Sequence, residues 1–150
     1  KNIDKIISLF NEIGVESVFH TGDIANSTSL EKFSRLNCKL YGVYGNNDRS
    51  ETDLDVVVKR NNFQFSNPPV KIAKGDRTIV IFHEPDLVEE FLLDNSNIDL
   101  VLHGHTHRYR NEVFKETHIF NPGECAGLIK GKNSIGVISV MDPEMEIIKF

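Results

Sequence analysis

The sequence has no long apolar run, no run of basic residues and few cysteines. Every apolar stretch is shorter than the roughly 18 residues that a membrane-spanning helix needs, so no membrane association is expected. Lys and Arg total 17 against 22 Asp and Glu, and the net charge of −5 argues against a nucleic-acid partner. Cys38 and Cys125 lie far apart without a CxxC motif, which argues against a disulfide framework. We therefore expect a reducing, cytoplasmic setting.

The remaining composition is that of a globular protein. The chain has 150 residues, of which 39% are hydrophobic and 26% charged. This length is enough for one domain with a real core and short of two typical domains. Because we find no internal repeat or linker, we expect residues 1–150 to form a single domain.

Apolar spacing in the first half predicts helices that alternate with short strands. Helices are expected around 3–13, from 28 onward and around 54–59, and strands at 17–20 and 40–45. Gly14 should end the first helix. Residues 28–31 resemble a capping box that opens the second helix, with Leu30, Phe33 and Leu36 facing inward.

The second half is richer in strands. A hairpin of 70–73 and 77–83 should turn at Gly75, and a helix should begin at Pro85 with Leu87, Val88, Phe91 and Leu92 on one face. Further strands are expected at 98–103, 112–116, 118–122, 134–140 and 145–150, the last two joined by 141–144. This order predicts a layered α/β domain with sheets packed between helices.

Polar clusters follow the predicted strands. The candidate site residues in these clusters are Asp23, Asn46, Asp48, His83, His105 and His107. In open α/β sheets ligand sites form at the carboxyl ends of strands, so these side chains should converge on one rim. Gly22, Gly45 and Gly104 would allow the sharp turns that this needs. We expect His20 to be a packed side chain, and His103 a buried or supporting one.

Carboxylate and amide oxygens combined with imidazoles are typical of a divalent-metal site. This donor set suits Mn²⁺, Fe²⁺, Zn²⁺, Co²⁺ or Ni²⁺ better than Ca²⁺. His105 and His107 would point to the same side of an extended segment, whereas in a turn each could face a different ion. Either arrangement suits two metal ions about 3.5–4 Å apart.

Five motifs occur in order: GD at 22–23, GNND at 45–48, the strand-end His83, GHTH at 104–107 and NPGE at 121–124. Together they resemble the calcineurin-like metallophosphoesterase superfamily, and within it the small YfcE-type phosphodiesterases of bacteria and archaea. The resemblance implies an α/β fold in which a two-sheet β-sandwich is flanked by helices. It also implies that Asp23 bridges two metals, that Asn46, His83 and His105 complete one site, and that His107 belongs to the other.

The sequence departs from the family pattern in three places. The family opens with a strand that carries D-x-H, whereas this sequence starts at Lys1 inside the first expected helix, and Asp4 is followed by no suitable His. We expect that strand to precede Lys1 in the natural protein; a chain that truly began at Lys1 should be unstable or borrow a strand. Asn47 stands where many members carry a His that protonates the leaving group, and Asn cannot do so near neutral pH. Glu84 follows His83 where Gly is more usual, which should reshape the pocket rim.

These observations predict a metal-dependent phosphoesterase. Two divalent ions would bridge a hydroxide that attacks a small phosphoester, and Asp48 would orient a ligand or the hydroxide. Cyclic nucleotides, other phosphodiesters and monoesters all stay open as substrates, and the resemblance makes a homodimer a reasonable expectation. The alternative is a non-catalytic interaction module on the same fold, like the metallophosphoesterase-like subunit of retromer. A metal-sensing or storage protein is a further rival that needs neither a buried rim nor the NPGE loop.

Overall fold

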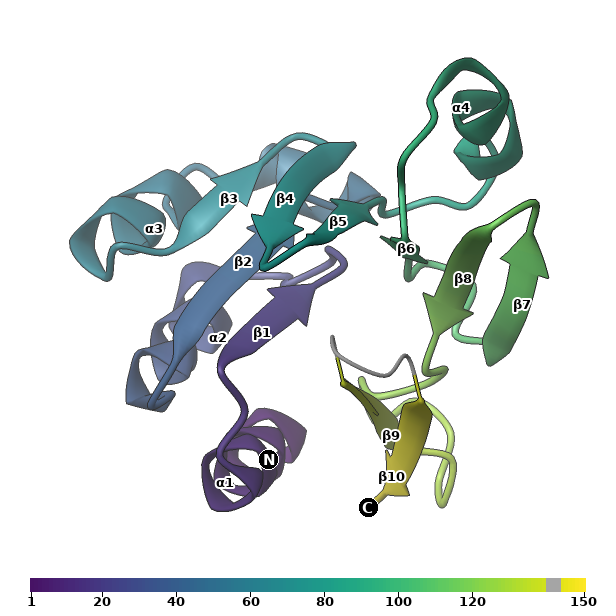
Figure 1. The fold of residues 1–150 in the computed structure, drawn as a ribbon. Coiled ribbons are helices and arrows are strands. Elements are labelled where there is room, and N and C mark those ends of the chain that lie inside the picture. The colour runs from purple at the N-terminus through teal and green to yellow at the C-terminus, as the bar shows by residue number, and fades with distance from the viewer. Residues whose placement is uncertain (140–143) are drawn as a thin grey trace.

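The structure, a computed structural model, describes residues 1–139 and 144–150 (Figure 1). The helices are α1 (Asn2–Ile13), α2 (Ser27–Glu31), α3 (Leu54–Arg60) and α4 (Val88–Asp94), with the 3-10 turns η1 (Lys32–Arg35) and η2 (Asn46–Ser50). The strands are β1 (Ser17–His20), β2 (Lys39–Val43), β3 (Gln64–Ser66), β4 (Val70–Lys74), β5 (Arg77–Ile81), β6 (Leu100–Leu102), β7 (Arg110–Phe114), β8 (Thr117–Asn121), β9 (Ser134–Ile138) and β10 (Met145–Lys149).

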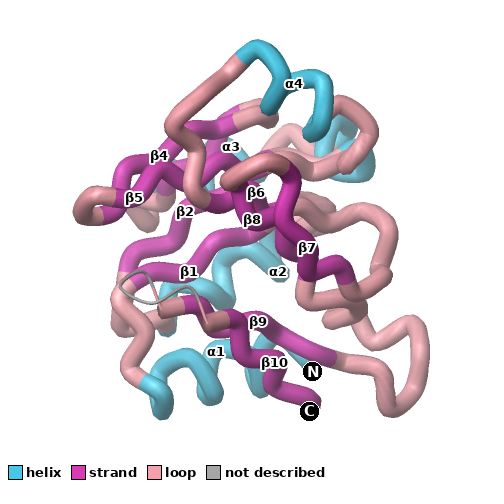
Figure 2. The backbone as a smooth tube through the Cα atoms, turned by 45° about the vertical axis from the view of Figure 1, so that its right-hand side comes forward, coloured by secondary structure: helices cyan, strands magenta, loops and turns pink. Residues whose placement is uncertain are grey.

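The strands pair into two larger sheets and one hairpin. The first sheet is parallel and has the order β1-β2-β3. The second sheet has the order β4-β5-β6-β8-β7, in which β5, β6 and β8 run parallel while β4 and β7 are antiparallel edge strands. The antiparallel pair β9 and β10 lies beside them (Figure 2). The carboxyl ends of the parallel strands supply the loops that build the site.

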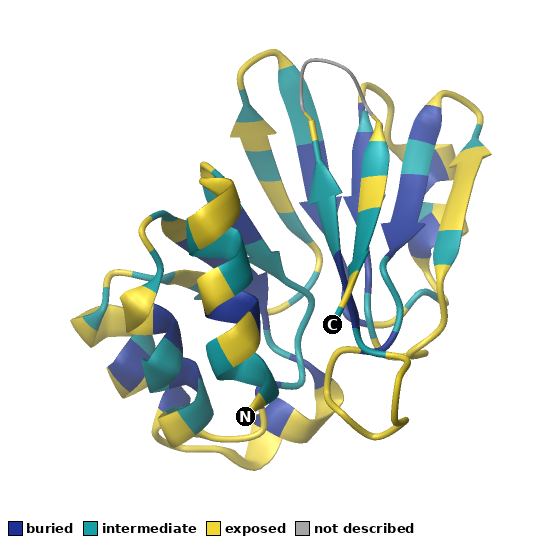
Figure 3. Cartoon of the chain, turned by 90° about the horizontal axis from the view of Figure 1, so that it is seen from below, coloured by how far each residue is buried: buried dark blue, intermediate teal, exposed yellow. Residues whose placement is uncertain are grey.

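Alternating side chains on the strands create layers. Val18 and Leu40 pack with apolar residues of α1, α2 and α3 on one face of the first sheet, whereas Phe19 and Tyr41 point to its other face. On the second sheet, Val80 and Val101 pack under α4. The opposite faces of the two sheets share an interior, since Phe19 packs against apolar residues of both. Figure 3 shows the buried stretches of the strands in dark blue. The predicted two-sheet sandwich flanked by helices is confirmed.

Two helix starts differ from the prediction. The second helix begins at Ser27, because Asn26 is its N-cap and accepts a hydrogen bond from the Ser29 N–H at 2.8 Å, so the capping box placed at 28–31 is wrong. The fourth helix begins at Val88 and not at Pro85. Leu87 therefore lies before the helix and is 63% exposed, where the prediction placed it on one helix face with Val88 and Leu92.

Both predicted glycine turns are confirmed, whereas the strand expected at 112–116 runs from Arg110 to Phe114, because Lys115 and Glu116 form the turn to β8. Gly14 ends α1 in the left-handed conformation, with φ 77°, and Gly75 forms the β4–β5 turn with φ 56°. The short strand β3 was not predicted. The expected connection 141–144 lies, apart from Glu144, outside the described residues. In the part of the chain that the structure describes, no helix combines the length and apolarity needed to cross a membrane.

Candidate metal centre

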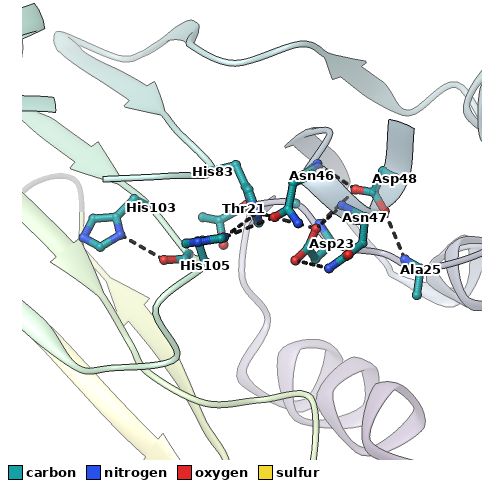
Figure 4. Close-up of polar contacts among 12 residues, drawn as sticks. Thr21, Asp23, Ala25, Asn46, Asn47, Asp48, His83, His103 and His105 are labelled. Carbon is teal, nitrogen blue, oxygen red and sulfur yellow. Dashed lines mark hydrogen bonds and ion pairs between the residues drawn. The ribbon is translucent and has the colours of Figure 1, made fainter. Parts of the chain in front are cut away.

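The carboxyl ends of β1, β2, β5 and β6 bring four of the predicted side chains together. Asp23 follows β1, Asn46 opens the turn after β2, and His83 and His105 follow β5 and β6. Backbone bonds extend the sheet ladder to the site, since the Gly104 N–H donates to the His83 carbonyl at 3.0 Å. Figure 4 shows the side chains pointing toward one another from these separate loops.

The spacing of the possible ligand atoms matches the space around one cation. Asn46 Oδ1 lies 2.8 Å from His83 Nε2 and 3.2 Å from His105 Nδ1, and the two ring nitrogens are 3.2 Å apart. Asp23 Oδ1 lies 3.5 Å from His83 Nε2. Ligand atoms that each lie about 2.1 Å from a metal ion are separated by roughly 3.0–3.4 Å. The four residues therefore fit a divalent ion.

His83 presents a lone pair to this cluster. The residue is 2% exposed, and Nδ1 lies 2.7 Å from the Thr21 carbonyl oxygen, which can only accept a hydrogen bond. Nδ1 therefore carries a proton, and in the neutral form of the ring Nε2 points its lone pair toward Asn46 Oδ1 and Asp23. Lone pairs that face one another repel, and a bound cation turns that repulsion into coordination.

Asp48 holds the loops that carry two of these ligands. The side chain is 3% exposed and belongs to the turn after β2. Oδ2 accepts from the N–H groups of Asp23 at 2.8 Å and Gly45 at 2.7 Å, and Oδ1 accepts from that of Ala25 at 3.0 Å. Asp48 thus holds the backbone of Asp23 in place, and its predicted role of orienting a metal ligand or the hydroxide stays a prediction.

Asp23 itself is held from the other side by Asn47. The Asn47 N–H donates to Asp23 Oδ1 at 3.0 Å, and the Asn47 side-chain amide donates to Oδ2 at 2.8 Å. Gly45 makes this approach possible, since a Cβ there would overlap Asp23 and lie 2.8 Å from His83 Cε1. Here the glycine supplies space, whereas the sequence suggested that it supplies a sharp turn.

His105 and His107 lie in a turn, so the extended alternative is wrong. Both have left-handed backbones, with φ 62° and 54°, and their side chains diverge. His105 joins the cluster of Asp23, Asn46 and His83, whereas His107 Nδ1 forms a short hydrogen bond with Glu124 Oε2. The ligand atoms of Asp23, His83 and His105 all lie within 4.8 Å of one another. The structure does not bring His107 into that group. That His107 is a ligand of a second ion stays a prediction.

Two further histidines, His20 and His103, lie close to the site in sequence and are packed inside the protein. His20 accepts from the Gly22 N–H at 3.1 Å and packs edge-on against Phe33, as expected of a packed side chain; burial lowers the pKa of His20 to about 4. His103 is 1% exposed, and burial lowers its pKa as well. Both rings therefore stay neutral near pH 7.

Sequence reasoning missed the roles of Thr21, Asn47 and Glu124. Thr21 acts through its carbonyl, for which the sequence carries no signal. Asn47 was noted only as a missing proton donor, although it bonds Asp23 twice. Glu124 stands in the NPGE motif, and that motif was the signal that could have drawn attention to a buried carboxylate.

Comparisons with known proteins identify the family of the chain. Residues 1–143 match the family model for the calcineurin-like phosphoesterase superfamily domain, and the chain belongs to that superfamily. The phosphodiesterase MJ0936 of Methanocaldococcus jannaschii is 31% identical over 145 residues, which cover 95% of this chain and 87% of the relative.

Solved structures share the fold. The structure of a novel archaeal phosphodiesterase superposes with a TM-score of 0.89 at 30% identity, covering 99% of this chain and 92% of that chain. The Escherichia coli phosphoesterase Yfce gives 0.65 at 20% identity, covering 98% and 91%. A Vps29 variant of Entamoeba histolytica gives 0.67 at 15% identity, covering 98% and 89%. The last two likenesses concern the fold alone.

Proposed function

We propose that this chain is a divalent-metal-dependent phosphodiesterase. The observation that carries the proposal is the convergence of Asp23, Asn46, His83 and His105 from four strand ends, at separations that fit one cation. Membership of the phosphoesterase superfamily and likeness to an archaeal phosphodiesterase support it. Mn²⁺, Fe²⁺, Co²⁺, Ni²⁺ and Zn²⁺ all suit the mixed oxygen and imidazole donors.

The residues have distinct tasks in this proposal. A bound divalent ion would lower the pKa of water and neutralise charge on the phosphoryl group. Asp23 would supply the negative charge that retains the cation, while Asn46, His83 and His105 would supply neutral donors. Thr21 fixes the tautomer of His83, and Asp48 and Asn47 fix Asp23. Asn47 donates hydrogen bonds but has no proton to give a leaving group near pH 7, so we expect substrates whose leaving groups need little protonation.

A second ion would require His107 as a ligand together with donors beyond the four-residue cluster. The proposal includes such an ion because the sequence motifs resemble those of two-metal enzymes. A small phosphoester substrate, a homodimer and a cytoplasmic location stay predictions made from the sequence.

Asp23→Asn tests the proposal. The substitution keeps the shape of the side chain and removes the charge that offsets the cation, so turnover of bis-p-nitrophenyl phosphate should fall by more than about 100-fold. The assay compares metal-free protein with protein given Mn²⁺, Ni²⁺, Co²⁺ or Mg²⁺ in turn. Asp76→Asn, in the exposed β4–β5 turn, is the matched control and should keep full turnover. Near-normal turnover by Asp23→Asn at saturating Mn²⁺ would refute the proposal.

The alternative function is that of a non-catalytic interaction module. The similarity of the fold to that of Vps29 is the reason to test it. A module that had lost catalysis would have no need to keep four mutually oriented ligand atoms. Absence of metal-stimulated turnover with every ion tried, in a protein that still folds, would favour the module.

A further inference from the structure

Glu124 is a buried carboxylate with hydrogen-bond partners on both of its oxygens. It follows β8, in the loop that leads to β9, and is 3% exposed. Oε1 accepts hydrogen bonds from the N–H groups of Gly127 at 2.7 Å and Leu128 at 3.0 Å. Among the residues that the structure describes, Oε2 has one hydrogen-bond partner, Nδ1 of His107. The carboxylate is therefore fixed on one oxygen and aimed at the imidazole with the other.

This contact determines where His107 carries its proton. An ionised carboxylate can only accept, so the shared proton belongs to Nδ1 of the ring. The lone pair of a neutral His107 then lies on Nε2, at the opposite edge. The side chain is 37% exposed, and within residues 1–139 and 144–150 Nε2 has no hydrogen-bond partner. The ring thus offers one tethered nitrogen and one open nitrogen.

We infer that Glu124 is a positioning residue that holds His107 in the tautomer whose Nε2 binds a divalent cation. The inference rests on the proposed metal dependence, because it assigns the open nitrogen to that ion. Metal-binding histidines commonly donate their other N–H to a carboxylate, which fixes the ring and raises the basicity of the ligand nitrogen. Removing such a partner typically weakens metal binding about 10–100-fold.

A structural role for Glu124 makes a different prediction, and Glu124→Gln separates the two. The Gln carbonyl oxygen can still accept from the Gly127 and Leu128 N–H groups, so the loop keeps its anchor. The Gln NH₂ then faces His107 and donates to Nδ1. This forces the ring proton to Nε2 and blocks that nitrogen as a ligand.

The experiment has two readouts besides activity. In metal-free protein at about pH 8, where an ordinary histidine is neutral, ¹⁵N NMR of the ring should place the His107 proton on Nδ1 in the wild type and on Nε2 in Glu124→Gln. Calorimetric titration with Mn²⁺ should show a 10–100-fold weaker affinity for Glu124→Gln. Glu112→Gln, which alters an exposed ion pair with Arg110, is the matched control and should leave both readouts unchanged.

A double-mutant comparison completes the test. In a His107→Ala background, Glu124→Gln should weaken Mn²⁺ binding no further, because its effect passes through the ring. An equal loss in both backgrounds would show a merely structural role and overturn the inference. So would a wild-type His107 with its proton on Nε2, which needs no variant, or a wild type that binds no Mn²⁺. If these readouts behave as expected but no phosphodiester is hydrolysed, the inference stands and the proposed function fails.

Discussion

Asp48→Asn should lower the free energy of unfolding more than the same kind of substitution at an exposed carboxylate. Asp48 connects two loops, because its side chain accepts hydrogen bonds from three backbone N–H groups. In the variant, the one remaining carbonyl oxygen can replace Oδ2 and serve the N–H groups of Asp23 and Gly45. The new NH₂ group then faces the Ala25 N–H, which loses its acceptor. An N–H group left unpaired away from water costs about 1–3 kcal/mol. Loss of the charge from the two other hydrogen bonds adds about 1 kcal/mol.

We therefore expect Asp48→Asn to lower the free energy of unfolding by about 3 kcal/mol. Urea denaturation followed by circular dichroism measures the loss. Asp55→Asn is the matched control, since Asp55 is an exposed carboxylate bonded to the Tyr44 hydroxyl, and its change should stay within about 0.5 kcal/mol. Mn²⁺ affinity should fall along with stability only for Asp48→Asn, because only that variant releases Asp23. Equal stability of the two variants would refute the reasoning.

Two further predictions concern the segment around Asp23. Ala25 has φ 75°, a conformation that costs an alanine about 1 kcal/mol, so Ala25→Gly should raise the free energy of unfolding by up to that amount; a loss of stability would contradict this. Burial lowers the pKa of His20 to about 4 from an ordinary 6.5, so the unfolded chain binds the extra proton first and stability is lost as pH falls from 6.5 to about 4. His20→Gln should reduce that loss by about 3 kcal/mol between urea titrations at pH 7 and pH 4. Identical losses in both proteins would exclude His20 as the cause.

The layers of the fold could be predicted because they depend on local spacing. One face of the first sheet carries Val18 and Leu40, and the other carries Phe19 and Tyr41. Such alternation can be recognised in the sequence. Helix starts were harder to predict. Asn26 and Thr28 are both acceptable N-caps, and only the path of the chain out of the Asp23 turn decides between them.

The site was predictable in its residue types and less so in its geometry. Asp23, Asn46, His83 and His105 were placed together because each follows a parallel strand, and parallel strands end at one edge. The divergence of His105 and His107 depends on two left-handed residues that sequence patterns do not reveal. The partners of Asp48 are backbone N–H groups, two of them in another loop, and backbone groups carry no residue-type signal.

The strained residues explain why the site is surrounded by so many hydrogen bonds. Asp23, Ala25, His105 and His107 all have positive φ values, which cost non-glycine residues on the order of 1 kcal/mol each. Asp48 binds the N–H groups of two of them, and Glu124 holds the ring of a third. These partners stabilise conformations that the local sequence disfavours. Asp48 keeps Asp23 directed at the four-residue cluster before any ion arrives, and Glu124 fixes the ring of His107 apart from that cluster. A cation that enters such a cluster has little ordering left to pay for, which favours tight binding and a fixed geometry for chemistry.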